Sequence, residues 1–94
     1  MKSYMVIAKF KDGVTPDQIR ELVPAEQEQA KDLEAQGLLG TIKVAMPKRT
    51  VFLEAFAASE SDALENLQTL PLAKLWTMEI YETTPSAGAL TVAS

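Results

Sequence analysis

Glu26 is the residue of this chain whose type and position could support acid–base chemistry. Residues 15–37 follow a helical pattern in which the apolar side chains form one stripe, at about 100° per residue. That stripe consists of Ile19, Leu22, Val23, Ala30 and Leu33. Measured from Ile19, Glu26 lies at about −20°, inside the stripe. A carboxylate on the side of a helix that faces a core must be paired, hydrogen-bonded or protonated, so Glu26 is the candidate general acid and base.

Pro24 leaves a second interpretation of this segment open. A proline inside a helix removes one backbone hydrogen bond, so the segment could kink there or divide into two helices. If a new helix began at Pro24, Glu26 would be an exposed acid of its first turn, favoured by the helix dipole. The pattern alone does not choose between these two interpretations.

The composition restricts the chemistry that the chain could perform. The 94 residues include no cysteine and no histidine, which excludes thiolate nucleophiles, zinc–thiolate sites and the usual haem ligand. An acid–base catalyst must then be Glu, Asp, Lys, Tyr or a substrate group, and we expect no cofactor. The net charge of −4 argues against a nucleic-acid partner. With no signal-peptide pattern and no apolar run of about 18 residues, we expect no membrane partner and a cytoplasmic location.

Periodicity predicts the elements that must position Glu26. We expect strands over residues 3–10, 38–45, 51–57 and 75–82, and helices over residues 16–36 and 60–70. Thr15 with Pro16 and Ser59 are the expected helix starts, and Gly37 and Pro71 are the expected stops. The order β-α-β-β-α-β predicts one ferredoxin-like α+β domain over residues 1–85, in which two helices cover one face of a four-stranded antiparallel sheet. Residues 86–94 form a tail of small residues.

The other face of the predicted sheet is also apolar. It carries Met5, Ile7, Phe52, Phe56 and Tyr81. An exposed apolar patch of this kind usually marks an interface, so we predict a homodimer in which two sheets pack face to face. The same face carries the charged residues Lys9, Lys43, Glu54 and Glu79. These could pair across the interface or only line its wet rim.

Several features in order give the chain a resemblance to a known family. They are the Thr15-Pro16 helix start, Ala25-Glu26, Gly37 and Leu70-Pro71-Leu72. In this order and spacing the chain resembles the muconolactone δ-isomerase family of the dimeric α+β barrel superfamily, over roughly residues 1–85. The family's helix carries an acid that matches Glu26. The true isomerases are rich in Trp, Arg and His after the glycine, whereas residues 38–42 here are LLGTI, so the resemblance implies a different substrate.

The resemblance implies an isomerase-like enzyme that shifts a proton in a small unsaturated lactone or enol-type metabolite. One carboxylate in a dry pocket can remove the proton at one carbon and return it at another. An enolate-like intermediate also needs a donor or a cation nearby. The candidates for binding the substrate are Tyr4, Trp76, Lys48 and Arg49. The two aromatic residues could instead be core packing on the helix-covered face, and the two cations could belong to a solvated turn.

Two other functions remain open at this stage. The same fold could support a cofactor-free oxygenase or cyclase that acts on an aromatic or polyketide-like substrate, by analogy alone. The chain could also be a non-catalytic dimer that binds a small molecule, or a dimer that assembles further. The non-catalytic alternative predicts that Glu26 is exposed, or bonded to the backbone with no cavity beside it.

Overall fold

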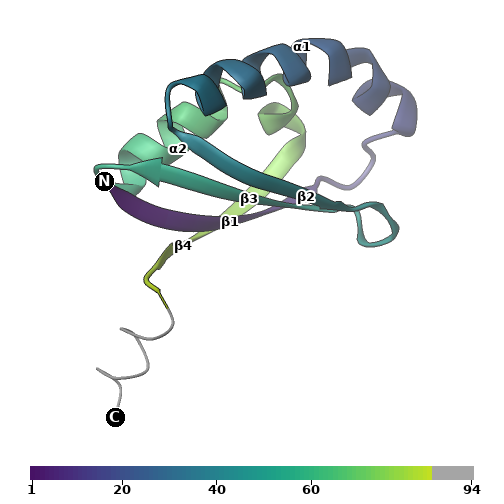
Figure 1. Cartoon of the computed structure of the whole chain (residues 1–94). Helices are drawn as coiled ribbons and strands as arrows, with labels where there is room; N and C mark the ends of the chain where they lie inside the picture. The colour runs from purple at the N-terminus through teal and green to yellow at the C-terminus, as the bar shows by residue number, and fades with distance from the viewer. Residues whose placement is uncertain (86–94) are drawn as a thin grey trace.

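The computed structural model describes residues 1–85, and the predicted tail over residues 86–94 lies outside the described residues. The elements follow the predicted β-α-β-β-α-β order, with two short 3-10 helices added (Figure 1). They are β1 (Lys2–Phe10), α1 (Pro16–Ala35), β2 (Leu39–Ala45), η1 (Met46–Lys48), β3 (Thr50–Ala57), α2 (Glu60–Gln68), η2 (Pro71–Leu75) and β4 (Trp76–Thr83).

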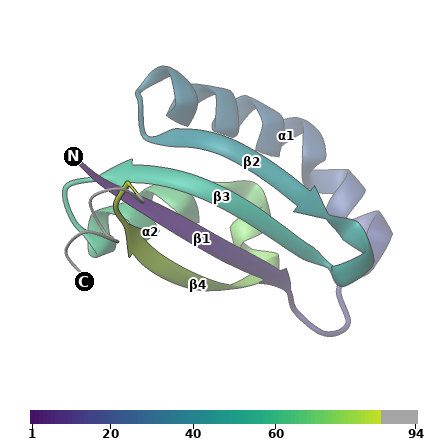
Figure 2. The ribbon, with the colours of Figure 1, turned by 60° about the horizontal axis from the view of Figure 1, so that its bottom comes forward.

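The four strands form one antiparallel sheet in the order β2-β3-β1-β4. In Figure 2 the strands lie in front of both helices, so α1 and α2 cover the same face of the sheet. This arrangement confirms the predicted ferredoxin-like α+β fold. In the part of the chain that the structure describes, no helix is both long and apolar enough to cross a membrane.

The hydrophobic core lies between the helices and the sheet. In β1, Tyr4, Val6 and Ala8 are buried, whereas Met5 and Lys9 are exposed on the opposite face, as the alternation predicts. The other elements contribute Leu33, Leu53, Ala63, Leu67, Leu70 and Trp76, among others, to the same buried cluster. The core therefore holds α1 and η2 close to the sheet.

Helix α1 is continuous from Pro16 to Ala35, so the interpretation in which a new helix begins at Pro24 is wrong. Its start is a complete capping box: Gln18 N donates to Thr15 Oγ1, and Thr15 N donates to Gln18 Oε1 at 2.8 Å. Pro24 is exposed, and so is Arg20, whose carbonyl loses its helical partner to the proline. The helix continues past the proline to Ala35 in spite of the lost backbone hydrogen bond.

Several predicted boundaries differ from the observed ones. Helix α2 ends at Gln68 and not at residue 70, because Thr69 N and Oγ1 donate to the last carbonyls of the helix. Helix η2 was not predicted, and it takes up Leu75, so β4 begins one residue later than predicted. Strand β2 begins at Leu39, and its pairing with β3 is irregular between Leu39 and Ile42. Gly40 lies in this irregularity, where a Cβ atom would overlap the Glu54 carboxylate.

Candidate functional site

Glu26 lies half-buried on the inner side of α1, within the apolar stripe that the sequence predicts. Its Oε1 accepts a hydrogen bond from the backbone N–H of Leu72, with a nitrogen–oxygen distance of 2.8 Å. Leu72 is the first residue of η2 with an N–H to donate, because Pro71 has none. A second bond, from Gln29 Nε2 to Thr69 Oγ1 at 2.7 Å, ties α1 to the C-cap residue of α2. The bond from Leu72 holds the carboxylate of Glu26 against η2, and the bond to Thr69 holds α1 beside the end of α2.

A cavity of about 280 Å³ lies beside Glu26, between α1, the sheet and η2. Its lining residues are Glu26, Gln27, Ala30, Ile42, Val44, Val51, Leu53, Leu72 and Trp76. Most of these side chains are aliphatic, and among residues 1–85 Glu26 is the one charged residue in the lining. Also within this range, no three acidic side chains converge as metal ligands would. The cavity therefore brings one carboxylate to an apolar space that could admit a small molecule.

Burial raises the pKa of the Glu26 carboxyl above its ordinary value of 4.5, and the hydrogen bond from Leu72 N–H opposes that rise. The first effect is the larger one, because the apolar surroundings disfavour the charged form. A carboxyl group whose pKa is raised towards neutrality can both accept and return a proton near physiological pH. This is the property that a proton-shuttling carboxylate needs.

The raised pKa predicts how stability depends on pH. Between the ordinary pKa and the raised pKa, the folded chain binds more protons than the unfolded chain, so protonation of Glu26 favours folding. This stabilisation is fully present below the ordinary pKa and is lost as the pH rises through the raised pKa. We therefore expect Glu26→Gln to gain stability relative to the unmodified chain between acidic and neutral pH. Urea unfolding at one acidic and one neutral pH measures this gain in the free energy of unfolding.

Glu28→Gln is the matched control for that experiment. Glu28 is exposed on the same helix, so its replacement removes one negative charge from α1 without touching the cavity. The quantity to compare is the pH dependence of the change in unfolding free energy that each variant causes. If this dependence is no larger for Glu26→Gln than for Glu28→Gln, burial of the Glu26 carboxyl does not cause it. A large loss of stability at both pH values would instead make Glu26 a structural group.

Trp76 is the predicted binding residue that the structure brings to Glu26. It lines the same cavity and is 5% exposed, on the helix-covered face where the sequence places it. Its ring meets Phe10 edge-on, with the ring centroids 6.1 Å apart. Its Nε1 is buried and has no hydrogen-bond acceptor among residues 1–85. A buried donor without an acceptor is unusual in a folded protein.

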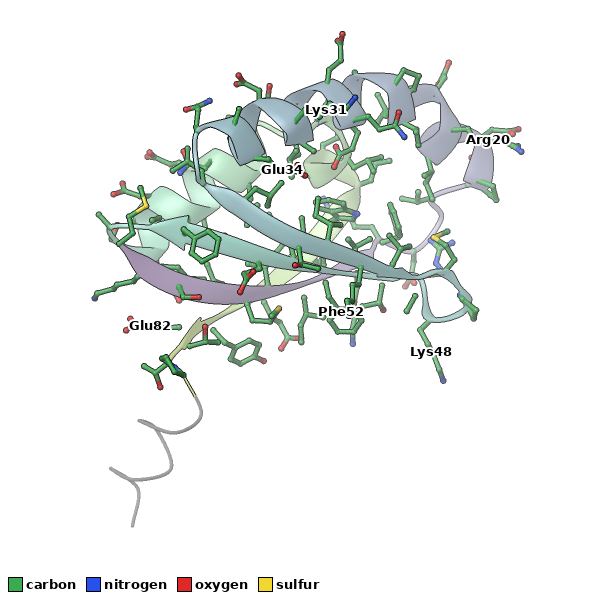
Figure 3. All side chains as sticks on the ribbon, viewed as in Figure 1. Arg20, Lys31, Glu34, Lys48, Phe52 and Glu82 are labelled. Atoms are coloured by element: carbon green, nitrogen blue, oxygen red, sulfur yellow. The ribbon has the colours of Figure 1, made fainter. Side chains whose placement is uncertain are left out.

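The other three predicted binding residues lie elsewhere. Tyr4 is 1% exposed in the core and is not among the residues that line the cavity. Lys48 is exposed in η1, and Figure 3 shows it projecting from that loop. Arg49 follows it with a positive φ of 50°, and its Nη2 donates to the carbonyls of Lys11 and Val14. The guanidinium of Arg49 therefore joins this loop to the segment before α1.

The backbone donor to Glu26 and most of the cavity wall were not predicted from the sequence. The signal for the donor is present in Leu70-Pro71-Leu72: a proline that opens a short helix leaves the next N–H as its first free donor. Ile42 and Val44 form the wall on β2, and their alternation with Thr41 and Lys43 could have indicated it. No pattern in the sequence shows that Glu26 reaches Leu72, 46 residues away.

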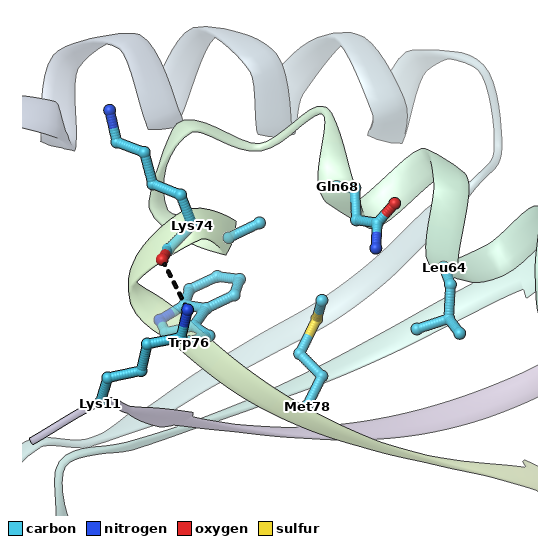
Figure 4. Close-up of a pocket in the computed structure, with 7 residues that line it drawn as sticks. Lys11, Leu64, Gln68, Lys74, Trp76 and Met78 are labelled. Carbon is cyan, nitrogen blue, oxygen red and sulfur yellow. Dashed lines mark hydrogen bonds between the residues drawn. The ribbon is translucent and has the colours of Figure 1, made fainter.

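A second hollow, of about 510 Å³, lies on another side of Trp76, between α2 and β4 (Figure 4). Its lining includes Leu64, Gln68, Met78 and two lysines, Lys11 and Lys74. Lys11 Nζ donates to the backbone carbonyl of Lys74 at 3.3 Å. Cations therefore border this hollow, whereas none of the described residues that line the Glu26 cavity is a lysine or an arginine.

Comparison with known proteins does not identify a family for this chain. No protein-family description matches the sequence, and no curated protein matches it significantly.

Proposed function

We propose that the chain is an isomerase-like enzyme that shifts a proton within a small unsaturated lactone or a related enol-type molecule. The observation that carries the proposal is Glu26, a half-buried carboxyl with a raised pKa beside an apolar cavity. The resemblance to the muconolactone δ-isomerase family supports it, because the acid of that family's helix matches Glu26. The departures over residues 38–42 are the reason to expect a different substrate.

The hydrogen bond to Leu72 assigns different roles to the two oxygens of Glu26. Oε1 accepts from Leu72 N–H, and Oε2 accepts no hydrogen bond from the described residues. Oε2 is therefore the oxygen that takes the proton from a carbon next to the substrate carbonyl, which leaves an enolate. The same Oε2–H then returns the proton to another carbon of the conjugated system, so the double bond moves and no atom is gained or lost. Leu72 N–H can keep its bond to Oε1 in both protonation states.

The proposal includes a homodimer that forms through the uncovered face of the sheet. Phe52 is 39% exposed there, Met5 37% and Tyr81 50%. Figure 3 shows Phe52 on the side of the sheet away from α1. No ion pair joins Lys9, Lys43, Glu54 or Glu79 to one another within residues 1–85. Glu79 accepts a hydrogen bond from the Tyr81 hydroxyl, whereas Lys9, Lys43 and Glu54 could pair with a second sheet. That second sheet would complete the dimeric α+β barrel expected from the resemblance.

One observation supports a non-catalytic alternative. Because Glu26 accepts from the first free N–H of η2, it could serve only to hold η2 against α1. A cofactor-free oxygenase or cyclase has less support, since Trp76 is the single aromatic residue of the described cavity wall. An activity test separates an enzyme from a structural use of Glu26.

The test is proton exchange into candidate substrates. The protein is incubated in D₂O with a panel of uncharged unsaturated lactones, and proton NMR follows the positions next to the carbonyl. We expect protein-dependent loss of the signal at one such carbon, together with movement of the double bond. If no member of a broad panel exchanges faster than in buffer, while members of that panel bind, the isomerase proposal is wrong and the chain is a binder.

A further inference from the structure

One row of residues crosses the uncovered face of the sheet from edge to edge. Strand pairing places Lys43 of β2 beside Phe52 of β3. Phe52 in turn lies beside Ile7 of β1, and Ile7 lies beside Glu79 of β4. Figure 2 shows the four strands side by side in this order, on the face that no helix covers. The row therefore has a cation at one edge, two apolar side chains in the middle and an acid at the other edge.

The two charges at the ends of the row are exposed and can each take a further partner. Lys43 takes part in no ion pair among residues 1–85. Glu79 Oε2 accepts from the Tyr81 hydroxyl, and its Oε1 accepts no hydrogen bond from the described residues. Both oxygens of a carboxylate can accept, so Glu79 can keep Tyr81 and still meet a cation. Three strand spacings of about 4.8 Å each separate Lys43 from Glu79, so the two cannot pair within one chain.

The same face carries a hollow near one edge and a protruding side chain at the other. The hollow, of about 300 Å³, is lined by Met5, Thr41, Lys43, Phe52 and Glu54. Tyr81 protrudes from β4 at the opposite edge, with half of its surface exposed. Strand pairing places Tyr81 beside Met5, and Met5 beside Glu54, so Tyr81 stands level with the hollow along the strands. A second copy that is rotated by 180° about the strand direction would bring its Tyr81 over this hollow.

We propose that a second copy of this chain packs on the uncovered face with the two-fold axis along the strands, so that β2 of each copy lies over β4 of the other. Lys43 of each copy then meets Glu79 of the other, and Phe52 meets Ile7. Tyr81 of each copy enters the hollow of the other. The proposal rests on the homodimer of the proposed function, and it adds the orientation of the two copies and the residues that select it.

The charges of the edge strands favour this orientation over the other one that keeps the strands aligned. Facing sheets usually keep their strands within about 30° of each other, and the two-fold axis of such a pair runs along the strands or across them. An axis across the strands places β2 over β2 and β4 over β4. Strand β2 contains a lysine and no acid, whereas β4 contains acids and no cation. Like charges would then face each other at both edges, which is unfavourable where water is excluded.

Reversal of the two charges tests the orientation. Lys43→Glu and Glu79→Lys should each raise the dissociation constant of the dimer at least about tenfold, because each creates two like-charge contacts in a two-fold interface. The variant that carries both changes should regain the affinity of the unmodified chain, since every contact again joins opposite charges. Sedimentation velocity over a range of protein concentrations measures these constants. Lys31→Glu is the matched control, because Lys31 is exposed on α1, on the other side of the sheet (Figure 3).

Tyr81→Ala tests the contact with the hollow independently of the charges. Loss of a buried aromatic side chain from two equivalent contacts should raise the dissociation constant more than about tenfold. Tyr81→Phe keeps the ring and should dimerise nearly as the unmodified chain does. Because Lys43, Glu79 and Tyr81 are exposed in the single chain, we expect every variant to fold, and circular dichroism checks this.

Three results would overturn the proposed orientation. One is a pair of single charge variants that dimerise as well as the unmodified chain, which an axis across the strands predicts. Another is a double variant that dimerises no better than the single ones, and the third is an unchanged dimer with Tyr81→Ala. If aspartates at Phe52 and Phe56 dissociate the dimer while these variants leave it intact, the homodimer stands and the orientation alone is wrong. A monomeric unmodified chain would contradict both.

Discussion

Glu26→Gln is expected to lower the rate of deuterium incorporation into a substrate by about 10²- to 10⁴-fold, the usual contribution of a general acid or base. Glutamine has nearly the same shape as glutamate, and its carbonyl oxygen can still accept from Leu72 N–H. It cannot take up and return a proton. The variant therefore removes the chemistry and keeps the contact between α1 and η2.

A matched control variant and a folding measurement distinguish a loss of catalysis from a loss of folded protein. Glu28→Gln, on the exposed side of α1, is expected to leave the exchange rate unchanged. Circular dichroism and urea unfolding of Glu26→Gln report whether the variant is folded. A folded variant that still exchanges protons at the original rate would exclude Glu26 as the acid–base group and favour its structural role at η2.

Replacing both Phe52 and Phe56 with aspartate is expected to convert a dimer into monomers. Phe52 lies exposed and Phe56 half-buried on the uncovered face of the sheet. Burial of a phenylalanine side chain contributes about 1.5–3 kcal/mol, and a two-fold interface would contain both residues twice. The aspartates would also place unpaired charges in the interface. The dissociation constant should therefore rise by more than about a hundredfold.

Sedimentation velocity of the variant and of the unmodified chain measures this effect. Replacement of both residues with leucine is the control, because it keeps the face apolar and should preserve the dimer. A monomeric unmodified chain, or a dimer that survives the aspartates, would contradict face-to-face packing of the sheets. Circular dichroism should remain native in every variant, since neither side chain belongs to the buried core.

The fold was predictable because its signals are periodic and local. Alternation along residues 3–10 placed Tyr4 and Val6 on the buried face, and Thr15-Pro16 marked the start of α1. Pro24 could not be resolved from the sequence, because its effect depends on whether the freed Arg20 carbonyl meets water. The short helix η2 was missed since its one turn has no amphipathic period of its own.

The candidate site was predictable only in part. Helical spacing placed Glu26 in the apolar stripe, and strand alternation placed Tyr4 and Trp76 on the same face of the sheet. Which of the two aromatics meets the cavity depends on the three-dimensional packing of η2 and α1 against the sheet. That packing brings Trp76 to Glu26 and leaves Tyr4 in the core. The backbone contacts of Arg49 likewise follow from the loop geometry, which no local pattern encodes.

The pKa of Glu26, measured by carboxyl-carbon NMR across pH in the unmodified chain, tests the acid–base assignment most directly. We expect the Glu26 signal to titrate with a midpoint above the ordinary value of 4.5, because burial outweighs the hydrogen bond from Leu72. A midpoint at or below the ordinary value would mean that Glu26 is a solvated or hydrogen-bond-stabilised carboxylate, which would contradict its assignment as the general acid and base.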